Sequence, residues 1–237
     1  MKVIAIASRK GGTGKTETCR ALAAGLTKKG YKVLVVDTDA QRNLSQSMQA
    51  DESKPTLFDV LEDTAGISDA IQTTKQGDLI QADELLYSVK GIKIDTIKNL
   101  IRPLKQYDFI LFDTAPALTQ LTASVMTATD GIIITSQADY HSLASLKGIA
   151  DETKSLKVKI YGILITRYQN NRISKDMAES IKTIAGLIGT RTFEKPIREC
   201  VSVKESVIEN KSIFDYAKRC NAASDYQSFV DEFLALV

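Results

Sequence analysis

The stretch Arg9–Thr16 has the sequence RKGGTGKT, and it decides the fold class of this chain. It directly follows a short apolar run, Val3–Ala7, and it opens a segment with helical periodicity, Lys15–Lys28. A glycine-rich turn between a buried strand and a helix directs backbone N–H groups toward an anion at the amino end of that helix. The stretch therefore predicts a phosphate-binding loop.

Two side chains of this loop have the chemistry that a nucleoside triphosphate requires. Lys15 would neutralise the β- and γ-phosphates, and the Thr16 hydroxyl would ligate Mg²⁺. A bare Gly-Lys-Thr triplet is a weak signal, but here the glycines, the preceding strand and the following helix all agree. The sequence thus predicts binding of a phosphorylated nucleotide with a divalent cation.

Short runs rich in Val and Ile alternate with longer segments of helical periodicity along the rest of the chain. The expected strands are Val3–Ala7, Lys32–Asp37, Phe109–Phe112, Ile132–Thr135 and Ile160–Ile165. The expected helices are Lys15–Lys28, Ile94–Lys105, Leu118–Ala128, Leu143–Leu156, Ile173–Ile188 and an amphipathic closing helix over Ala222–Val237. Continuous apolar strands separated by helices are typical of a parallel sheet that is covered on both faces. We therefore expect a doubly wound α/β fold with a mostly parallel sheet, formed by residues 1–237 as a single domain.

One region lacks a clean period. Residues Ala50–Gly91 contain only short helical fragments such as Thr56–Leu61, and we expect surface helices and loops at an edge of the sheet.

The composition of the whole chain excludes some kinds of site. With 31 Lys and Arg against 29 Asp and Glu, any nucleic-acid contact must come from a local patch. Three scattered cysteines and a single histidine do not make a zinc site, and the cysteines are expected to be reduced thiols.

The form of the phosphate loop identifies a family. A standard P-loop has glycine where this chain has Arg9, whereas K-G-G-x-G-K-T resembles the deviant Walker A motif of the ParA/MinD superfamily. The resemblance extends over the whole chain, and it implies a P-loop NTPase fold that uses ATP and Mg²⁺. It also implies that Lys10 is the signature lysine, which reaches the phosphates of the other subunit in a nucleotide-sandwich dimer. A solvated loop lysine is the alternative interpretation of Lys10.

Further motifs follow in the order of the family. Asp37–Leu44 (DTDAQRNL) resembles its D-x-D-P-Q-x-N-L segment, and Tyr107–Pro116 resembles a strand that ends in Walker B. The resemblance implies that Asp39 orients the attacking water, that Asp37 supports the site, and that Asp113 is a Mg²⁺ partner through water. An ordinary loop turn with helix caps is the alternative for the aspartates. The catalytic residues expected from the resemblance are Lys10, Lys15 and Asp39, and the metal-site residues are Thr16, Asp39 and Asp113.

The second half of the chain resembles the ParA branch of the family. The resemblance rests on Ser136–Leu143, on Gly162–Tyr168, and on Pro196–Ser206, Ile213–Tyr216 and Tyr226 in the tail. It implies that Thr166, Arg167 and the Pro196–Arg198 loop flank the adenine. The residues expected to contact the nucleotide are therefore Lys10, Gly11, Gly12, Thr13, Gly14, Lys15, Thr16, Glu17, Thr166, Arg167, Pro196 and Ile197.

Three positions depart from the family pattern. Glu17 stands where relatives have a second threonine that helps hold the α-phosphate, and a carboxylate there would repel phosphates unless it points outward. Ala40 replaces the usual proline, and Asn221 stands where a basic residue is usual. DNA affinity is therefore expected to be weaker than in relatives, or the basic patch to be built differently.

The resemblance implies a function in DNA segregation. We expect a Mg²⁺-dependent ATPase with slow basal turnover that partitions a plasmid or chromosome. Its ATP-bound homodimer would bind nonspecific DNA and leave it when a ParB-like partner stimulates hydrolysis. The residues expected to contact DNA are Arg198, Lys204, Lys211, Lys218 and Arg219, for which a solvated helix face is the alternative. The expected location is the cytoplasm, in association with the nucleoid.

A MinD-like membrane-positioning ATPase is the alternative function. Membrane attachment of that kind requires Lys or Arg on the polar face of a C-terminal amphipathic helix. The segment Asp225–Val237 contains no Lys or Arg and three carboxylates, so we expect no membrane contact. Metabolic and electron-transfer relatives are a third class, but the three cysteines do not stand where an iron–sulfur cluster would need them.

Overall fold

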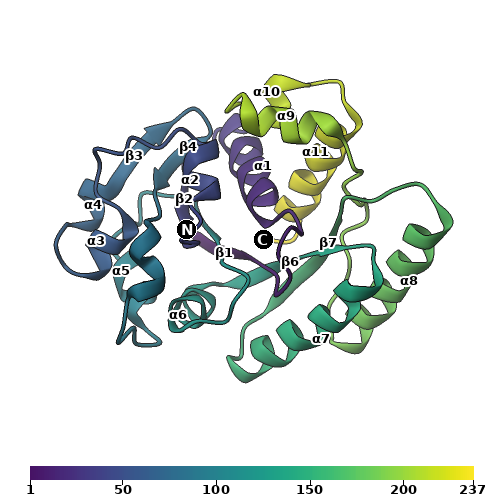
Figure 1. Ribbon diagram of the computed structural model, residues 1–237, viewed down its shortest axis with the longest axis horizontal. Helices are drawn as coiled ribbons and strands as arrows, with labels where there is room; N and C mark the ends of the chain where they lie inside the picture. The colour runs from purple at the N-terminus through teal and green to yellow at the C-terminus, as the bar shows by residue number, and fades with distance from the viewer.

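A seven-stranded sheet runs through the computed structural model, which describes all 237 residues (Figure 1). The strands are β1 (Lys2–Ala7), β2 (Val33–Asp37), β3 (Ile71–Thr74), β4 (Gly77–Ile80), β5 (Phe109–Asp113), β6 (Gly131–Gln137) and β7 (Ile160–Thr166). Their order across the sheet is β3-β4-β2-β5-β1-β6-β7, and every neighbouring pair is parallel except β3 and β4. The predicted α/β class with a mostly parallel sheet is confirmed.

The apolar side chains of the central strands are buried on both faces of the sheet. In β1, Val3, Ala5 and Ala7 join one core cluster, while Ile4 and Ile6 join the other. Successive side chains of a strand point to opposite faces, so a strand covered on both sides must be apolar throughout. This is why the runs of Val and Ile predicted these strands so closely.

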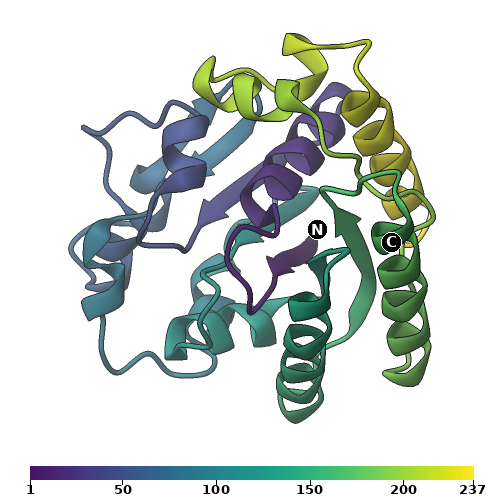
Figure 2. The same cartoon turned by 45° about the vertical axis from the view of Figure 1, so that its right-hand side comes forward.

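Helices cover the two faces in two layers (Figure 1). One layer contains α1 (Lys15–Lys28), α2 (Asn43–Ser47), α9 (Val201–Ile208), α10 (Ile213–Tyr216) and α11 (Asn221–Leu234). The other contains α3 (Leu57–Leu61), α4 (Ile67–Ala70), the 3₁₀ helix η1 (Glu84–Ser88), α5 (Thr96–Ile101), α6 (Gln120–Ala128), α7 (Tyr140–Ser155) and α8 (Arg172–Leu187). In the turned view, α7 and α8 lie side by side along the second layer (Figure 2). The sheet is thus doubly wound.

The six expected helices are all present, but their ends differ from the predicted ones. The largest difference is α5, which covers only Thr96–Ile101 of the predicted Ile94–Lys105. The closing helix α11 packs against α1, and a Cβ on Gly25 would lie only 2.7 Å from a methyl carbon of Val230. The close approach of these two helices buries the apolar stripe of α11, including Phe229 and Phe233. No helix has both the length and the apolar character needed to cross a bilayer.

The prediction for Ala50–Gly91 is wrong in part. Short helices do occur there, but the region also contributes β3 and β4, and β4 pairs in parallel with β2 inside the sheet. The pattern was missed because the two strands have four residues each and mix polar with apolar side chains, as in IQTT. Gly77, with a φ of 122°, closes the tight hairpin between them.

Candidate functional site

The phosphate loop lies at the carboxyl end of β1 and is held by side chains at the ends of β6 and β7. Thr166 at the end of β7 donates a hydrogen bond of 2.7 Å to the Thr13 carbonyl oxygen. Gln137 at the end of β6 donates one of 2.6 Å to the Gly12 carbonyl oxygen. Gly12 and Gly14 have φ values of 74° and 78°, a conformation that glycine adopts without strain. The loop is therefore fixed before any ligand arrives.

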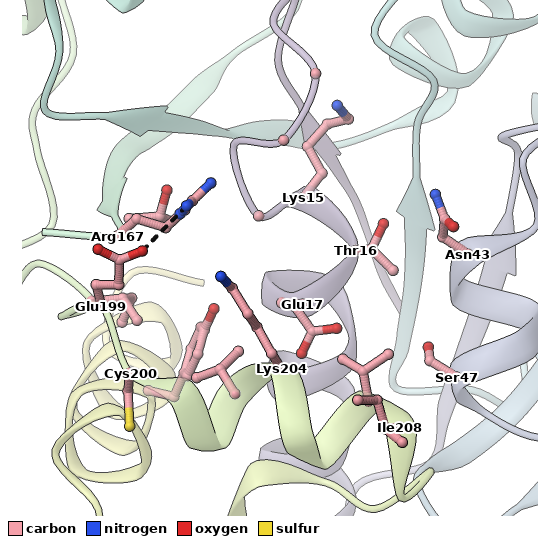
Figure 3. Close-up of a pocket in the computed structure, with 18 of the residues that line it drawn as sticks. Lys15, Thr16, Glu17, Asn43, Ser47, Arg167, Glu199, Cys200, Lys204 and Ile208 are labelled. Carbon is pink, nitrogen blue, oxygen red and sulfur yellow. Dashed lines mark hydrogen bonds and ion pairs between the residues drawn. The ribbon is translucent and has the colours of Figure 1, made fainter.

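Open space lies beside the loop. A Cβ added to Gly11 or Gly12 would meet no atom within 4 Å, so the backbone is accessible there. This space belongs to a cavity of about 890 Å³, large enough for a nucleotide, which Figure 3 shows in close-up. The loop residues that line it are Gly11, Gly12, Gly14, Lys15, Thr16 and Glu17. Lys10 and Thr13 do not line it.

Lys15 is the buried cation of this cavity. The residue is only 7% exposed, and in Figure 3 its side chain extends along the phosphate loop. Burial lowers the pKa of Lys15, while the negative charges of Asp113 and Asp39 oppose that shift. A partly desolvated ammonium group beside backbone N–H groups is well suited to bind phosphate oxygens.

Thr16 and Asp113 make direct contact and fit a magnesium site. The Thr16 hydroxyl donates a 2.7 Å hydrogen bond to Oδ2 of Asp113, whose Oδ1 is buried without a hydrogen-bond partner. Burial, followed by the charge of Asp37, raises the pKa of Asp113 well above its usual range. A buried carboxylate with an unused oxygen is stabilised by a nearby cation, and hydroxyl and carboxylate oxygens are ligands that Mg²⁺ accepts. These residues therefore suit the predicted ion.

Asp37 and Asp39 differ in their environment. Asp37 is fully buried, and its carboxylate accepts hydrogen bonds from the Ser45 amide at 2.9 Å and the Ser45 hydroxyl at 2.7 Å. Burial raises the pKa of Asp37 to about 6, although the Ser45 hydrogen bonds oppose this. Asp39 lines the cavity, and its Oδ1 accepts only the Gln41 amide. Asp37 therefore supports the turn after β2, while Asp39 is accessible to a ligand.

Lys10 lies outside the cavity and faces α7. Its ammonium group contacts the Asp139 carboxylate at 2.6 Å and the Ser142 hydroxyl at 3.3 Å. Asp139 is also the N-cap of α7, where it accepts the Ser142 amide. Next to it, Arg9 pairs with Glu152 of the same helix at 3.2 Å. The amino end of the phosphate loop is thus attached to α7 by two cations.

Glu17 lies in the cavity rather than outward in solvent. Figure 3 shows its carboxylate between the phosphate loop and α9. Burial raises the pKa of Glu17, and the Arg20 guanidinium, 2.9 Å away, opposes that shift. A carboxylate at this position would avoid repelling phosphates only if it pointed outward. Glu17 does not point outward, because it lines the cavity.

The five residues expected to flank the adenine occupy different places. The cavity is lined by Thr166, Arg167, Ile197 and Arg198, but not by Pro196. Thr166 is 2% exposed and mainly supports the loop, whereas Arg167 is exposed and pairs with Glu199 at 3.2 Å. The cavity wall beyond the loop thus comes from the ends of β7 and the following segments.

The five cations expected to contact DNA do not form one uniform surface. Arg198 binds Asp225 through Nε at 2.8 Å and Nη2 at 2.7 Å, and Lys204 lines the cavity. Lys211 approaches Glu209 at 3.5 Å. Lys218 and Arg219 are exposed, and neither takes part in an ion pair. Lys218 and Arg219 therefore remain available for a phosphate backbone.

Other cavity residues were not predicted as site residues. They come from α2 and its flanking turns, from the segment after β5, and from the C-terminal region: Gln41, Asn43, Gln46, Ser47, Pro116, Glu199, Cys200, Val203, Val207, Ile208, Asn210 and Tyr226. Arg198 and Lys204 also line the cavity, although they were predicted as DNA contacts. Asn43 and Pro116 belong to motifs that the sequence does display, Asp37–Leu44 and Asp-x-x-Pro. No helix was predicted over Val201–Ile208, and the position of α9 beside the cavity became visible only in the fold.

Comparisons with known proteins agree with this architecture. A family model described as "AAA domain" matches residues 1–165. A ParA family protein of Chlamydia muridarum is 30% identical, with 100% of this chain and 99% of that protein covered. The chromosome partitioning protein ParA of Caulobacter vibrioides is 28% identical, over 99% of this chain and 94% of that protein.

Two solved structures are similar over almost their whole length. Apo McdA of Cyanothece has a TM-score of 0.88 at 25% identity, with 99% of each chain covered. The septum site-determining protein MinD of Pyrococcus horikoshii, solved in complex with Mg-ADP, has a TM-score of 0.84 at 26% identity. That comparison covers 99% of this chain and 97% of the other.

Proposed function

Because this chain belongs to the ParA/MinD family of P-loop ATPases, we propose that it is an ATP-dependent DNA-partition ATPase. The single observation that carries the proposal is the different placement of two lysines of one loop. Lys15 lies in the nucleotide-sized cavity, and Lys10 lies outside it, on the surface beside α7. A lysine that does not reach its own cavity could contact the phosphates of a second subunit once its pair with Asp139 opens, as an ATP-dependent homodimer requires.

Nucleotide binding would use the residues that line the loop side of the cavity. Backbone N–H groups of Gly11–Thr16 and the Lys15 ammonium group would hold the β- and γ-phosphates. Thr16 would ligate Mg²⁺ directly, and Asp113 and Asp39 would bind it through water. When bound, Mg²⁺ supplies positive charge that neutralises the phosphates during transfer. The adenine is proposed to lie beside Thr166, Arg167 and Ile197, which line the cavity.

Hydrolysis would depend on Asp39. Its carboxylate lines the cavity near Lys15, and its Oδ2 accepts no hydrogen bond from the protein, so it is available to hold a water molecule. Asp37 has no such freedom because Ser45 and the Asp39 amide occupy both of its oxygens. We propose that Asp39 orients the attacking water and that turnover is slow until a ParB-like partner stimulates it.

DNA binding would come from Lys218 and Arg219, with Lys211 and Lys204 contributing. The chain as a whole carries a net charge of only +2, so a monomer has a weak general attraction for DNA. Dimerisation doubles the number of exposed cations on one assembly. The proposed dimer should therefore bind DNA regardless of sequence, on the nucleoid, and lose it as the salt concentration rises.

The test is DNA retention at about 50 mM salt with ATP, ADP or no nucleotide. We expect retention with ATP only, and none for Lys15→Ala, which should not bind nucleotide. The double variant Lys218→Ala/Arg219→Ala should retain ATP binding and weaken DNA binding. The slope of the logarithm of DNA affinity against the logarithm of salt concentration should become shallower by about 2 per protomer. The matched control is Lys175→Ala/Lys182→Ala, which removes two exposed charges from α8 on the other face.

The alternative is a MinD-like membrane-associated ATPase, since MinD is among the similar structures. The apolar stripe of α11 is buried against α1 and the sheet, so it is not free to enter a lipid surface. Sedimentation with anionic liposomes in ATP, together with no DNA retention, would replace the partition proposal with this alternative.

A further inference from the structure

Glu17 gives this phosphate loop a negative charge at an unusual point. It follows Thr16 in the first turn of α1, where a hydroxyl would donate to the α-phosphate, but an ionised carboxylate can only accept. Its side chain lies in the cavity, as Figure 3 shows, and is only 21% exposed. The α-phosphate of a bound nucleotide would therefore meet a partly buried carboxylate.

Arg20 is the counter-charge of Glu17. It lies one helical turn further along α1, and its Nη2 is 2.9 Å from the Glu17 carboxylate. The Arg20 side chain is 2% exposed and ranks among the largest fully buried side chains of the protein. A buried guanidinium next to a carboxylate offsets much of that carboxylate's field, but it does not remove the charge.

The position of Arg20 is fixed from α9. Its Nη2 also donates to the Ser206 hydroxyl at 2.8 Å, and its Nη1 donates to the Ser206 carbonyl oxygen at 3.4 Å. Ser206 is fully buried, and its hydroxyl in turn donates to the Val203 carbonyl oxygen. Val203 and Lys204 of the same helix line the cavity. One guanidinium thus joins the first turn of α1 to the helix that covers the nucleotide.

We infer that Glu17 and Arg20 form a charge pair that sets how tightly the nucleotide is held and how fast it leaves. The Glu17 carboxylate opposes the α-phosphate, and Arg20, held in place by Ser206, limits that opposition. The inference rests on the proposed function, because it assumes that a nucleotide binds at the phosphate loop. Glu17 and Arg20 act as positioning and affinity-determining residues and do not take part in the chemical step.

The charge pair predicts that removing Glu17 and removing Arg20 change nucleotide affinity in opposite directions. A pair that only stabilised the fold would weaken nucleotide binding whichever partner was removed. Here, Glu17→Gln removes the opposing charge while an amide can still accept from Arg20 and donate to a phosphate, so affinity should rise. Arg20→Leu leaves the carboxylate without its counter-charge, so affinity should fall. Each change is expected to be about tenfold, the effect of one screened charge at a few ångströms.

The experiment measures binding and release of fluorescent ATP and ADP analogues with Mg²⁺ by the full chain. Glu17→Gln should bind both analogues about tenfold more tightly and release them more slowly, and Arg20→Leu should do the opposite. The double variant should return near the wild-type value, because it removes the negative and the positive charge together and leaves the net charge beside the nucleotide unchanged. Ser206→Ala should change affinity in the same direction as Arg20→Leu but by less, and Arg20→Lys should restore most of the wild-type affinity. Glu179→Gln on α8 is the matched control for net charge.

The possible outcomes are distinct. Reduced affinity in both single variants, or unchanged affinity in Glu17→Gln, would overturn the charge pair and leave a structural contact. If Arg20→Leu unfolds, as judged by its circular dichroism, Ser206→Ala and Glu17→Gln still decide the sign. A wild-type chain that binds neither analogue would instead overturn the proposed function.

Discussion

The phosphate loop and the segment Pro196–Arg219 are held in different ways. The loop is fixed by strand ends: Gln137 of β6 and Thr166 of β7 bond its carbonyl oxygens, and Thr16 bonds Asp113 of β5. The segment Pro196–Arg219 bonds the sheet through its backbone at Ile197, whose amide donates to the Ile165 carbonyl oxygen of β7. Further along, it is held by side-chain contacts with α11 and α1, such as Arg198 with Asp225 and Ser206 with Arg20. The positions of side chains at strand ends follow from backbone hydrogen bonds between the strands. The positions of side chains on surface helices depend instead on side-chain contacts with neighbouring helices.

This difference has a functional consequence. The backbone at the carboxyl edge of the sheet cannot shift without breaking sheet hydrogen bonds, so residues there suit chemistry that needs fixed distances. The exposed cations of Pro196–Arg219 can exchange partners at a small cost, because an exposed ion pair such as Lys211 with Glu209 contributes about 1 kcal/mol or less. We therefore expect substitutions at the sheet edge to affect hydrolysis and dimerisation strongly, and substitutions in the segment to affect stability and DNA binding moderately.

The largest effect is expected for Asp39→Ala. Loss of the group that orients the attacking water should reduce the rate of ATP hydrolysis by about 10²–10⁴ while ATP binding persists. The measurement is phosphate release under single-turnover conditions, with binding measured separately. Asp69→Ala on α4, which does not line the cavity, is the control. If Asp39→Ala hydrolyses ATP at the wild-type rate, another residue orients the attacking water. The contrast between the phosphate loop and the segment Pro196–Arg219 would then be weaker.

The next effect concerns Lys10. Lys10→Ala should leave the monomer's affinity for ATP close to the wild-type value, because Lys10 does not line its own cavity. It should weaken the ATP-dependent dimer by about 30-fold or more, since a charged contact to phosphate across an interface is lost. Light scattering or analytical ultracentrifugation with ATP measures this.

Asp139→Asn is the counterpart of that variant. The Lys10–Asp139 pair must separate before Lys10 can reach a second subunit, and both side chains are about one-third exposed. Weakening the pair should therefore strengthen the dimer by about two- to fivefold. A dimer that forms normally in Lys10→Ala, or that is unaffected by Asp139→Asn, contradicts the role of Lys10 across the interface.

The same contrast explains how much could be predicted from the sequence. Continuous apolar strands and the motifs after them predicted five of the seven strands, and the structure brings Lys15, Thr16, Asp39 and Asp113 together. The strands β3 and β4 could not be predicted, because four-residue strands with polar side chains carry no clear period. The hydrogen bonds between Arg198 and Asp225 could not be predicted either, because the two residues are 27 positions apart and no sequence motif links them.

The smallest effect is expected for the pair that holds Arg198. The Asp225 carboxylate accepts from Nε and Nη2 of Arg198 and from its amide, and Lys195 lies 3.0 Å away. Burial alone would raise the pKa of Asp225, but these cations and hydrogen bonds hold it below its usual range. A carboxylate whose folded pKa is lowered stabilises the fold above its unfolded pKa of about 4, and this contribution is lost as the pH falls below that value. Asp225→Asn should therefore lower the free energy of unfolding by about 1–2 kcal/mol at pH 7. The difference from wild type should shrink near pH 3.

Chemical denaturation at both pH values measures this effect, with Asp176→Asn as the control, since its pair with Arg172 is exposed and 3.8 Å long. Arg198→Ala should show a similar loss of stability and should weaken DNA binding less than Lys218→Ala/Arg219→Ala, because its guanidinium is already engaged. If Arg198→Ala instead weakens DNA binding most and leaves stability unchanged, Arg198 exchanges Asp225 for DNA phosphates. The segment Pro196–Arg219 would then change partners when DNA binds, which the strand-held phosphate loop cannot do.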